Sequence, residues 1–309
     1  MAAIDQVIHT RLCSDVLLVN QVGAHIIKSG GKRLRPALVV LSANAFGYQG
    51  KQHYDLATVV ELIHTATLLH DDVVDESKLR RGHATASALF GNAASVLVGD
   101  FLYSRAFQII VEVGEMRVMQ ILADATNTIA EGEVLQLLNC HDPGVDTDNY
   151  MRVIHCKTAK LFEASMRIGA ILGKASTTDE DAAARYGMHL GTAFQLMDDV
   201  LDYAADELQT GKHLGDDLAE GKPTLPLIYA IQHGSAEQAA IVRSAIEQGD
   251  MGNFAEVLQI IHATGALEFT RQQALCEAEL ACSAIKFMAD SKNKQCLLDL
   301  ARFAAIRQY

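Results

Sequence analysis

Apolar residues recur at helical spacing along most of the chain. Leu56, Val59, Val60 and Ile63, for example, fall on one face of a helix. No stretch alternates apolar and polar residues between turn signals, as a half-buried strand would. The pattern therefore predicts an all-α fold.

The same periodicity predicts where the helices begin and end. We expect one or two helices over residues 1–28, then helices over 37–46, 55–75, 92–113, 115–138, 150–173 and from 177 to about 202, and further helices over 226–309 with breaks near 234, 249–252, 265 and 290–293. Thr177 and Glu180 fit a capping box at the start of the helix that begins at 177. Residues 204–226 form the longest irregular segment, and their lysines and aspartates suit a lid over a metal–phosphate site.

No Ser- or Gly-rich linker and no repeat interrupts the chain, so a single domain over residues 1–309 is the simplest organisation. Within it, residues 1–28 would be N-terminal helices, 29–226 the core that carries the motifs, and 227–309 C-terminal helices. Abundant Ala and Leu, with only four prolines, favour helix over sheet.

The charge and the cysteines limit the partners and the compartment. A formal net charge of −12 argues against nucleic acid, which needs a basic face. The six cysteines are scattered, with no C-x-x-C pair, so we expect free thiols in a cytoplasmic protein rather than zinc ligands or disulfides. Residues 1–28 do not read as a secretory signal. The longest uncharged stretch, 84–99, is short for a membrane span, which leaves only peripheral contact with a membrane.

Two acidic DDxxD motifs each end an apolar helical segment. They consist of Asp71, Asp72 and Asp75, and of Asp198, Asp199 and Asp202. On a helix the first and last aspartates lie one turn apart, and the middle one is rotated by about 100°. Mg²⁺ suits such a site because it takes one or two carboxylates together with phosphate oxygens. One such motif could equally be a solvated helix end, but two in matching contexts favour metal binding. An EF-hand does not fit, because the sixth position of a loop that starts at Asp71 or Asp72 is Glu76 or Ser77, where the calcium loop needs Gly.

Basic residues are gathered at several places in this acidic chain. The segment 30–36, Gly-Gly-Lys-Arg-Leu-Arg-Pro, could be ordinary surface charge, but beside two glycines a phosphate clamp is the better interpretation. Arg80, Arg81, Lys157, Lys212 and Lys222 are further candidates, and no Walker or Rossmann phosphate loop is present. Metal ions can neutralise a departing diphosphate, and a dry apolar cavity suits the organic cation left behind. The sequence therefore predicts metal-assisted ionisation of a diphosphate ester.

On these motifs the chain resembles the trans-isoprenyl diphosphate synthases, and within them the bacterial long-chain enzymes of the octaprenyl type. The matching stretches are 30–36, 61–82, 91–100, 132–136, 157–159, 191–202 and 211–226, in family order and spacing. The resemblance implies an isoprenoid-synthase-type helical bundle around a deep central cavity. It also implies a Mg²⁺-dependent head-to-tail condensation of isopentenyl diphosphate onto an allylic diphosphate such as farnesyl diphosphate. The product would be about octaprenyl diphosphate, for a quinone side chain, and the enzyme a homodimer.

The resemblance also implies roles for individual residues. About three Mg²⁺ ions would be held by Asp71, Asp75 and Asp198, and the catalytic set would be completed by Asp72, Asp199, Asp202, Lys157 and Lys212. The allylic diphosphate would contact Arg80, Lys157, Thr158, Gln195, Lys212 and Lys222. Isopentenyl diphosphate would contact Lys32, Arg35, His64 and Arg81. No side-chain nucleophile is needed, because the departed diphosphate is expected to accept the final proton.

Product length is expected to depend on Ala66 and Thr67. They lie about one helical turn before Asp71, roughly 6–7.5 Å along the axis. In short-chain members of the family a bulky aromatic residue near this level closes the cavity, so two small residues imply a long product. They could instead be small simply to let helices pack closely.

Three other functions can be compared with this set of motifs. A shorter-chain synthase, making geranylgeranyl or farnesyl diphosphate, would share every motif above. A terpene cyclase would not require the second full acidic motif or the clamp at Lys32 and Arg35. A non-catalytic partner subunit of a heteromeric synthase would typically lose the acidic motifs, and this chain keeps both.

Overall fold

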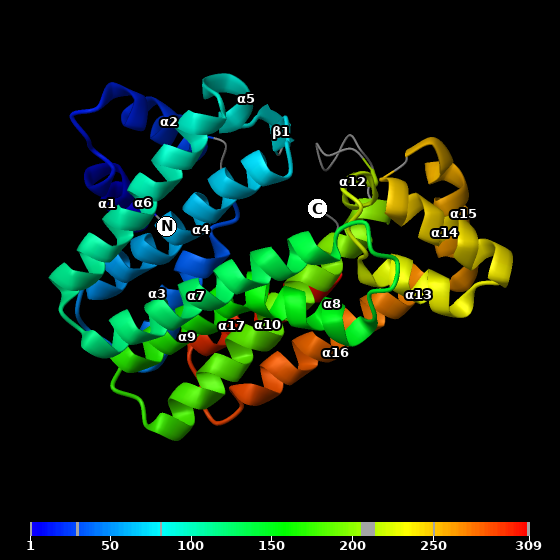
Figure 1. Cartoon of the computed structure of the whole chain (residues 1–309). Helices are drawn as coiled ribbons and strands as arrows, with labels where there is room; N and C mark the ends of the chain where they lie inside the picture. The colour runs from blue at the N-terminus through cyan, green and yellow to red at the C-terminus, as the bar shows by residue number, and fades with distance from the viewer. Residues whose placement is uncertain (1, 29–30, 81, 205–213, 250, 308–309) are drawn as a thin grey trace. The chain divides into compact units, whose positions relative to one another are not determined.

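The computed structural model describes residues 2–28, 31–80, 82–204, 214–249 and 251–307, and they are almost entirely helical (Figure 1). The helices up to the second acidic motif are α1 (Ala2–Arg11), α2 (Leu17–Lys28), α3 (Leu34–Ala45), α4 (Gln52–Val74), α5 (Ala86–Phe90), α6 (Asn92–Val113), α7 (Met116–Asn139), α8 (Thr147–Ile154), α9 (Lys160–Leu172) and α10 (Thr177–Ala204). They are followed by α12 (Asp216–Ala219), α13 (Leu225–His233), α14 (Ala236–Gln248), α15 (Phe254–Thr264), α16 (Ala266–Ala284) and α17 (Lys292–Ile306). The all-α prediction is confirmed.

The chain divides into two compact units. The first comprises Met1–Thr126, Leu161–Ala184 and Phe287–Leu297, and the second comprises Asn127–Lys160, Arg185–Lys286 and Leu298–Tyr309. Helices α7, α10 and α17 contribute residues to both units. The single-domain organisation and the deep central cavity stay predictions.

In the first unit α4 packs mainly against α6 and α3 (Figure 1). The stripe predicted from the sequence is buried, since Leu56, Val59 and Ile63 are each 0% exposed. Helices α3 and α9 approach closely at Gly169, where an added Cβ would come within 2.5 Å of the Ala43 backbone nitrogen. This packing makes α4 a rigid support for the first acidic motif at its end.

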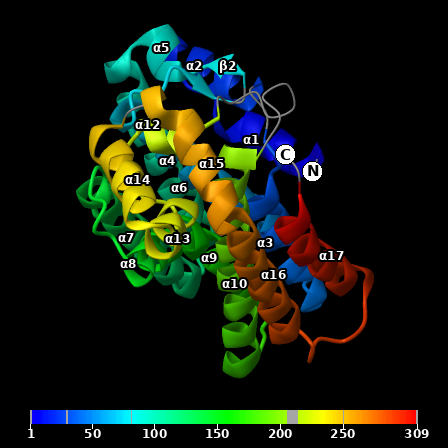
Figure 2. The same ribbon diagram turned by 90° about the vertical axis from the view of Figure 1, so that its right-hand side faces the viewer.

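In the second unit α13 packs against α14, α15 and α16, and both ribbon views show α13, α14 and α15 side by side (Figure 2). Their shared core includes Leu227, Val242, Ile246 and Ile261. The predicted breaks near 234, 249–252 and 265 fall at the ends of α13, α14 and α15. Tyr203, one residue after the second acidic motif, belongs to this core and fixes that end of α10.

The capping box predicted at Thr177 is wrong by one residue. Helix α10 already includes Thr177, and the Asp179 N–H donates to the Ser176 side chain at 3.2 Å. Glu180 is instead buried and forms ion pairs with Arg117 and Arg167 at 2.8 and 2.9 Å. A cap fits either Ser or Thr followed by an acidic residue, so the sequence alone could not choose between the two registers.

Three short features were not predicted. A two-stranded hairpin pairs β1 (Leu79–Arg80) with β2 (His83–Ala84), and Gly82 adopts a left-handed φ of 73° between them. The five-residue helix α5 follows at once. The expected helix over 150–173 is divided into α8 and α9 by a π-helical turn at His155–Ala159, a feature frequent at functional sites. All three are too short to leave a periodic signal.

Among the helices that the structure describes, α6 alone is long and apolar enough to cross a membrane, by length and composition only. It packs along α4 of the same unit. All six cysteines lie within the described ranges, and no disulfide joins any two of them there. The cytoplasmic location stays a prediction.

Candidate active site

The first acidic motif lies at the C-terminal end of α4. Asp71 and Asp72 belong to the last turn, and Asp75 follows the helix, its N–H donating to the Asp71 carbonyl oxygen at 2.8 Å. The Asp71 and Asp75 side chains are half-buried. Two carboxylates at the negative end of a helix dipole create a negative potential that favours a cation.

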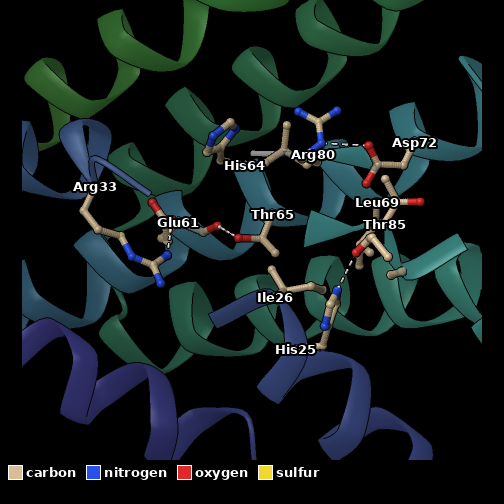
Figure 3. Close-up of a pocket in the computed structure, with 13 residues that line it drawn as sticks. His25, Ile26, Arg33, Glu61, His64, Thr65, Leu69, Asp72, Arg80 and Thr85 are labelled. Atoms are coloured by element: carbon tan, nitrogen blue, oxygen red, sulfur yellow. Dashed lines mark hydrogen bonds and ion pairs between the residues drawn. The ribbon is translucent and has the colours of Figure 1, made fainter. Parts of the chain in front are cut away.

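Asp72, the middle aspartate, is 5% exposed. Its Oδ1 accepts a hydrogen bond from Arg80 Nε at 2.7 Å (Figure 3). Burial raises the pKa of Asp72, and the positive charge of Arg80 opposes that rise. Asp72 therefore anchors Arg80 from the adjacent hairpin.

The hairpin that carries Arg80 is held in place by two further contacts. Thr85 Oγ1 donates to the Ser77 carbonyl oxygen at 2.7 Å, and it also accepts from the first turn of α5. His25 Nε2, from α2, donates to the Ala84 carbonyl oxygen at 2.9 Å (Figure 3). Arg81, predicted to bind isopentenyl diphosphate, lies outside the described residues.

A pocket opens beside α4 in the first unit, and its lining includes His25, Arg33, Glu61, His64, Asp72 and Arg80 (Figure 3). At one end of the pocket the carboxyl group of Glu61 forms an ion pair with Arg33. At the other end Asp72 forms an ion pair with Arg80. Two guanidinium groups thus border one pocket, each held by a carboxylate of α4. Such an arrangement suits an anion with several oxygen atoms.

The predicted clamp residues Arg35 and His64 are brought together. Arg35 Nη1 donates to His64 Nε2 at 3.0 Å, and the Arg35 guanidinium lies 4.4 Å from the centre of the Phe162 ring. Lys32 is exposed at the start of the same segment. Sequence reasoning missed Glu61 as a site residue, although a carboxylate inside an apolar helix is itself a signal, because a buried charge needs a partner.

The second acidic motif lies on α10, and Asp199, its middle aspartate, is 1% exposed. Its carboxylate accepts hydrogen bonds from Tyr150 Oη and from Gln195 Nε2, the latter at 2.8 Å. Thr158 Oγ1 in turn donates to Gln195 Oε1 at 3.0 Å. Burial raises the pKa of Asp199 well above its ordinary value. The structure thus joins three predicted site residues, Thr158, Gln195 and Asp199, and adds Tyr150, which carried no sequence signal.

Asp202 and Asp198 differ from each other in the second motif. Asp202 is 8% exposed, and its Oδ2 accepts the Asp217 N–H at 3.2 Å at the start of α12. The Asp198 side chain is 38% exposed, and its Oδ1 lies 2.7 Å from Arg307 Nη2. Asp198 is therefore the aspartate of this motif that keeps the most solvent access.

The predicted lysines are held by neighbouring acceptors. Lys157 Nζ lies 2.6 Å from Gln136 Oε1 and 2.5 Å from Glu133 Oε2, both on α7. An added Cβ at Gly132 would come within 2.7 Å of the Lys157 backbone nitrogen, so Gly132 permits this approach of the π-turn to α7. Lys222 forms an ion pair with Glu220. Lys212 lies outside the described residues.

The aspartates fit a hard divalent cation that is shared with a substrate. Within the described ranges, no group of three or more His, Cys, Asp or Glu side chains lies close enough to hold a metal ion by itself. A pair of carboxylates one turn apart, such as Asp71 and Asp75, instead suits Mg²⁺, which completes its coordination with water and phosphate oxygens. A donor set of oxygen atoms alone is also unusual for zinc, whose protein sites generally include His nitrogen or Cys sulfur ligands.

Ala66 and Thr67 differ in their surroundings. Ala66 is 0% exposed, as expected for a small residue at a close helix contact. Thr67 is half-buried, and its Oγ1 donates to the His64 carbonyl oxygen at 2.8 Å. Thr67 precedes Asp71 by four positions, so the two share a face of α4. Of the two residues, Thr67 is thus the more exposed and the one that shares the face of Asp71.

Comparison with known proteins assigns this arrangement to a family. The sequence profile described as "Polyprenyl synthetase" matches residues 16–263. The chain is 53% identical over 308 residues to an octaprenyl diphosphate synthase of Escherichia coli strain K12, covering 99% of this chain and 95% of that one. It is 51% identical over 310 residues to an octaprenyl diphosphate synthase of Haemophilus influenzae, covering 100% and 94% of the two chains.

The fold is shared with solved structures. A polyprenyl synthase from Caulobacter crescentus CB15, crystallised with calcium and isoprenyl diphosphate, superposes with a TM-score of 0.97 at 42% identity. That comparison covers 100% of this chain and 95% of the other. A divalent cation and an isoprenyl diphosphate thus occur together in a protein of the same fold.

Proposed function

The chain belongs to the polyprenyl synthetase family, and we propose that it extends an allylic primer such as farnesyl diphosphate with isopentenyl diphosphate to about octaprenyl diphosphate, for a quinone side chain. It is a prenyltransferase that makes a long-chain trans-polyprenyl diphosphate. The two relatives described above, each more than 50% identical to this chain, are octaprenyl diphosphate synthases, which supports eight isoprene units. The structural observation that carries the proposal is that both acidic motifs keep their first aspartate accessible while the second is buried and partnered.

Isopentenyl diphosphate binds beside α4 in this proposal. Arg35 and His64 form one donor group, and Lys32 and Arg81 supply further positive charge. The ion pair between Arg33 and Glu61 fixes the segment that carries Lys32 and Arg35 onto α4. Glu61 thereby positions the clamp without touching substrate.

The allylic diphosphate binds to side chains that the middle aspartates hold in place. Asp72 fixes Arg80, and Asp199 fixes Gln195, which accepts the Thr158 hydroxyl. Lys157, Lys212 and Lys222 complete this set. Each donor is thus oriented before substrate arrives, which reduces the entropy lost on binding.

The family uses a divalent metal, and we assign about three Mg²⁺ ions to Asp71, Asp75 and Asp198. When bound, these ions neutralise the charge that develops on the leaving diphosphate. The protein contributes apolar surface that excludes water, such as Leu68 and Leu69 beside the pocket. No side chain acts as a nucleophile, and the final proton passes to the departed diphosphate.

A homodimer is supported by the outer face of α6. Val96, Leu97 and Val111 are 37, 66 and 63% exposed on this one helix. Large apolar side chains exposed along one helix are compatible with a protein interface. The enzyme would act in the cytoplasm and release its apolar product through peripheral contact with a membrane.

Product analysis of the isolated chain tests the function. The purified protein is incubated with Mg²⁺, farnesyl diphosphate and labelled isopentenyl diphosphate, and the product is sized by chromatography. We expect about eight isoprene units. A product of three or four units would favour the shorter-chain alternative, and no product from the isolated chain would favour the non-catalytic subunit.

Two substitutions test how the length is set. Thr67→Phe should shorten the product, because Thr67 shares a face with Asp71. Ala66→Phe should also shorten it if the product passes Ala66. If Ala66 serves only helix packing, Ala66→Phe should leave the length unchanged and cost about 1–3 kcal/mol of stability by overpacking. Unchanged product length in both variants would show that neither residue sets the length of the product.

A further inference from the structure

Arg307 is buried although it lies close to the C-terminal end of the chain. It follows α17 directly, and its N–H donates to the Phe303 carbonyl oxygen at 3.0 Å. Arg307 is 5% exposed, whereas the preceding Ile306 is 64% exposed. An arginine is rarely buried unless it has a partner that compensates for lost hydration.

The partner of Arg307 is the second acidic motif. Arg307 Nη2 donates to Asp198 Oδ1 at 2.7 Å and to the Phe194 carbonyl oxygen at 2.8 Å. Its guanidinium carbon lies 3.9 Å from the centre of the Phe194 ring. Phe194 and Asp198 are one turn apart on α10, so Arg307 is held by a single face of that helix. The guanidinium group thus has a carboxylate, a carbonyl oxygen and an aromatic ring as specific binding partners on α10.

Asp198 is also the carboxylate of this motif that is best placed to take a metal. Asp199 is occupied by Tyr150 and Gln195, and Asp202 by the backbone of Asp217. The 38% exposure of Asp198 leaves part of its carboxylate accessible from solvent. The Arg307 ion pair and a metal ion would therefore compete for the same negative charge.

We infer that Arg307 is a positioning residue, a built-in counter-cation that neutralises Asp198 until a divalent cation replaces it. Metal loading at Asp198 is thereby coupled to release of the end of α17. This inference rests on the proposed function, which makes Asp198 a metal ligand. Two cations close to one carboxylate repel each other, so each weakens the binding of the other. Because such coupling is reciprocal, it is measurable from the metal and from the helix end.

The first test measures metal affinity rather than turnover. Mg²⁺ is titrated by calorimetry into the full chain with saturating inorganic pyrophosphate. Arg307→Gln should tighten Mg²⁺ binding by about tenfold, within the 5–150-fold range usual for coupled sites. Arg307→Lys, which keeps the charge, should stay near the wild type. Arg302→Gln is the matched control, because Arg302 is an exposed arginine of α17 that pairs with Asp299 at 3.5 Å. It should leave the affinity unchanged.

The second test follows the end of α17 in the wild type and needs no substitution. Amide hydrogens of residues 301–307 should exchange faster once Mg²⁺ and pyrophosphate are added. In Arg307→Gln they should exchange fast from the start, with no further change on adding metal. Unaltered exchange in the wild type at saturating Mg²⁺ and pyrophosphate would overturn the inference even if Arg307→Gln failed to fold.

A third variant distinguishes the metal role of Asp198 from the counter-cation role of Arg307. Asp198→Asn should weaken Mg²⁺ binding if Asp198 is a ligand. If Asp198→Asn binds Mg²⁺ as the wild type does, the proposed metal role of Asp198 fails, and the role of Arg307 fails with it. If Asp198→Asn weakens binding while Arg307→Gln leaves it unchanged or weaker, the proposed function stands and the counter-cation is overturned.

Discussion

The two acidic motifs have the same five-residue pattern, yet the structure uses their aspartates differently. In both, the middle aspartate is buried, at 5% exposure for Asp72 and 1% for Asp199. The third aspartates differ, because Asp75 follows the end of α4 and is half-buried, whereas Asp202 lies inside α10 at 8% exposure. The first motif therefore offers two accessible carboxylates and the second offers one.

The middle aspartates also differ in the charge of their partners. Asp72 is paired with a cation, Arg80, which opposes the rise in its pKa that burial causes. Asp199 is held by the neutral donors Tyr150 and Gln195, and burial raises its pKa well above the ordinary value. Both nevertheless act as anchors for side chains assigned to the allylic diphosphate. A repeated motif can thus combine metal ligands with internal supports.

Loss of a leading aspartate should have the largest effect. Asp71→Asn or Asp198→Asn should reduce kcat at saturating Mg²⁺ by about 10²–10³-fold, as for loss of one group that stabilises charge in a transition state. Both side chains are partly exposed, so circular dichroism and thermal unfolding should show a retained fold. Near-wild-type rates in both variants would remove the metal-site argument.

The third aspartates should separate the two motifs. Asp75→Asn should lower kcat by about 10²-fold, because Asp75 is assigned to a metal ion. Asp202→Asn should lower it by only about tenfold, as for a supporting residue, and should change stability little, because the amide oxygen can still accept the Asp217 N–H. Steady-state kinetics and urea unfolding measure the two quantities. Equal losses of kcat would show that the motifs are equivalent.

The middle aspartates should affect substrate binding more than metal binding. Asp72→Asn removes the charge that holds Arg80, so KM for the allylic diphosphate should rise about tenfold while the Mg²⁺ dependence stays the same. Tyr150→Phe is the milder counterpart at Asp199, and it should cost about 1 kcal/mol of stability. A large rise in the Mg²⁺ requirement of Asp72→Asn would instead make Asp72 a metal ligand.

The smallest effect concerns pH. The pKa of Asp199 is higher in the folded chain than in the unfolded chain, so between these two values the folded chain binds more protons. Stability contributed by this group therefore rises as pH falls through that window. Asp199→Asn mimics the protonated form, so the wild type should gain stability relative to it as pH falls through that window. Asp72→Asn should show a weaker trend, because Arg80 opposes the shift. Parallel unfolding curves for wild type and Asp199→Asn at all pH values would contradict this.

Much of the helical framework could be predicted from the sequence, because its signals are local. The stripe through Leu56, Val59 and Ile63 is buried as its spacing indicates, and α6 has the predicted bounds. The hairpin at Leu79–Ala84 was missed, because two-residue strands leave no alternation to detect. The cap of α10 was misplaced by one residue, because Ser176 and Thr177 are equivalent to a pattern rule.

The candidate site likewise has features that the sequence predicts and features that only the structure reveals. The motifs identify which aspartates could bind metal, and helical geometry shows that the middle one points elsewhere. The partners of these aspartates could not be predicted from the sequence. Arg80 lies on the hairpin that was not predicted, and Tyr150 and Arg307 are distant in sequence from α10. Tertiary contacts of this kind leave no local pattern, so burial and hydrogen bonding had to be seen in the structure.

Anomalous diffraction from crystals grown with Mn²⁺ and inorganic pyrophosphate tests the central claim most directly, because it locates each ion. We expect Mn²⁺ on the carboxylates of Asp71, Asp75 and Asp198, with Asp72 still paired to Arg80 and Asp199 still bonded to Tyr150. Mn²⁺ on Asp72 or Asp199, or its absence from Asp198, would contradict the account.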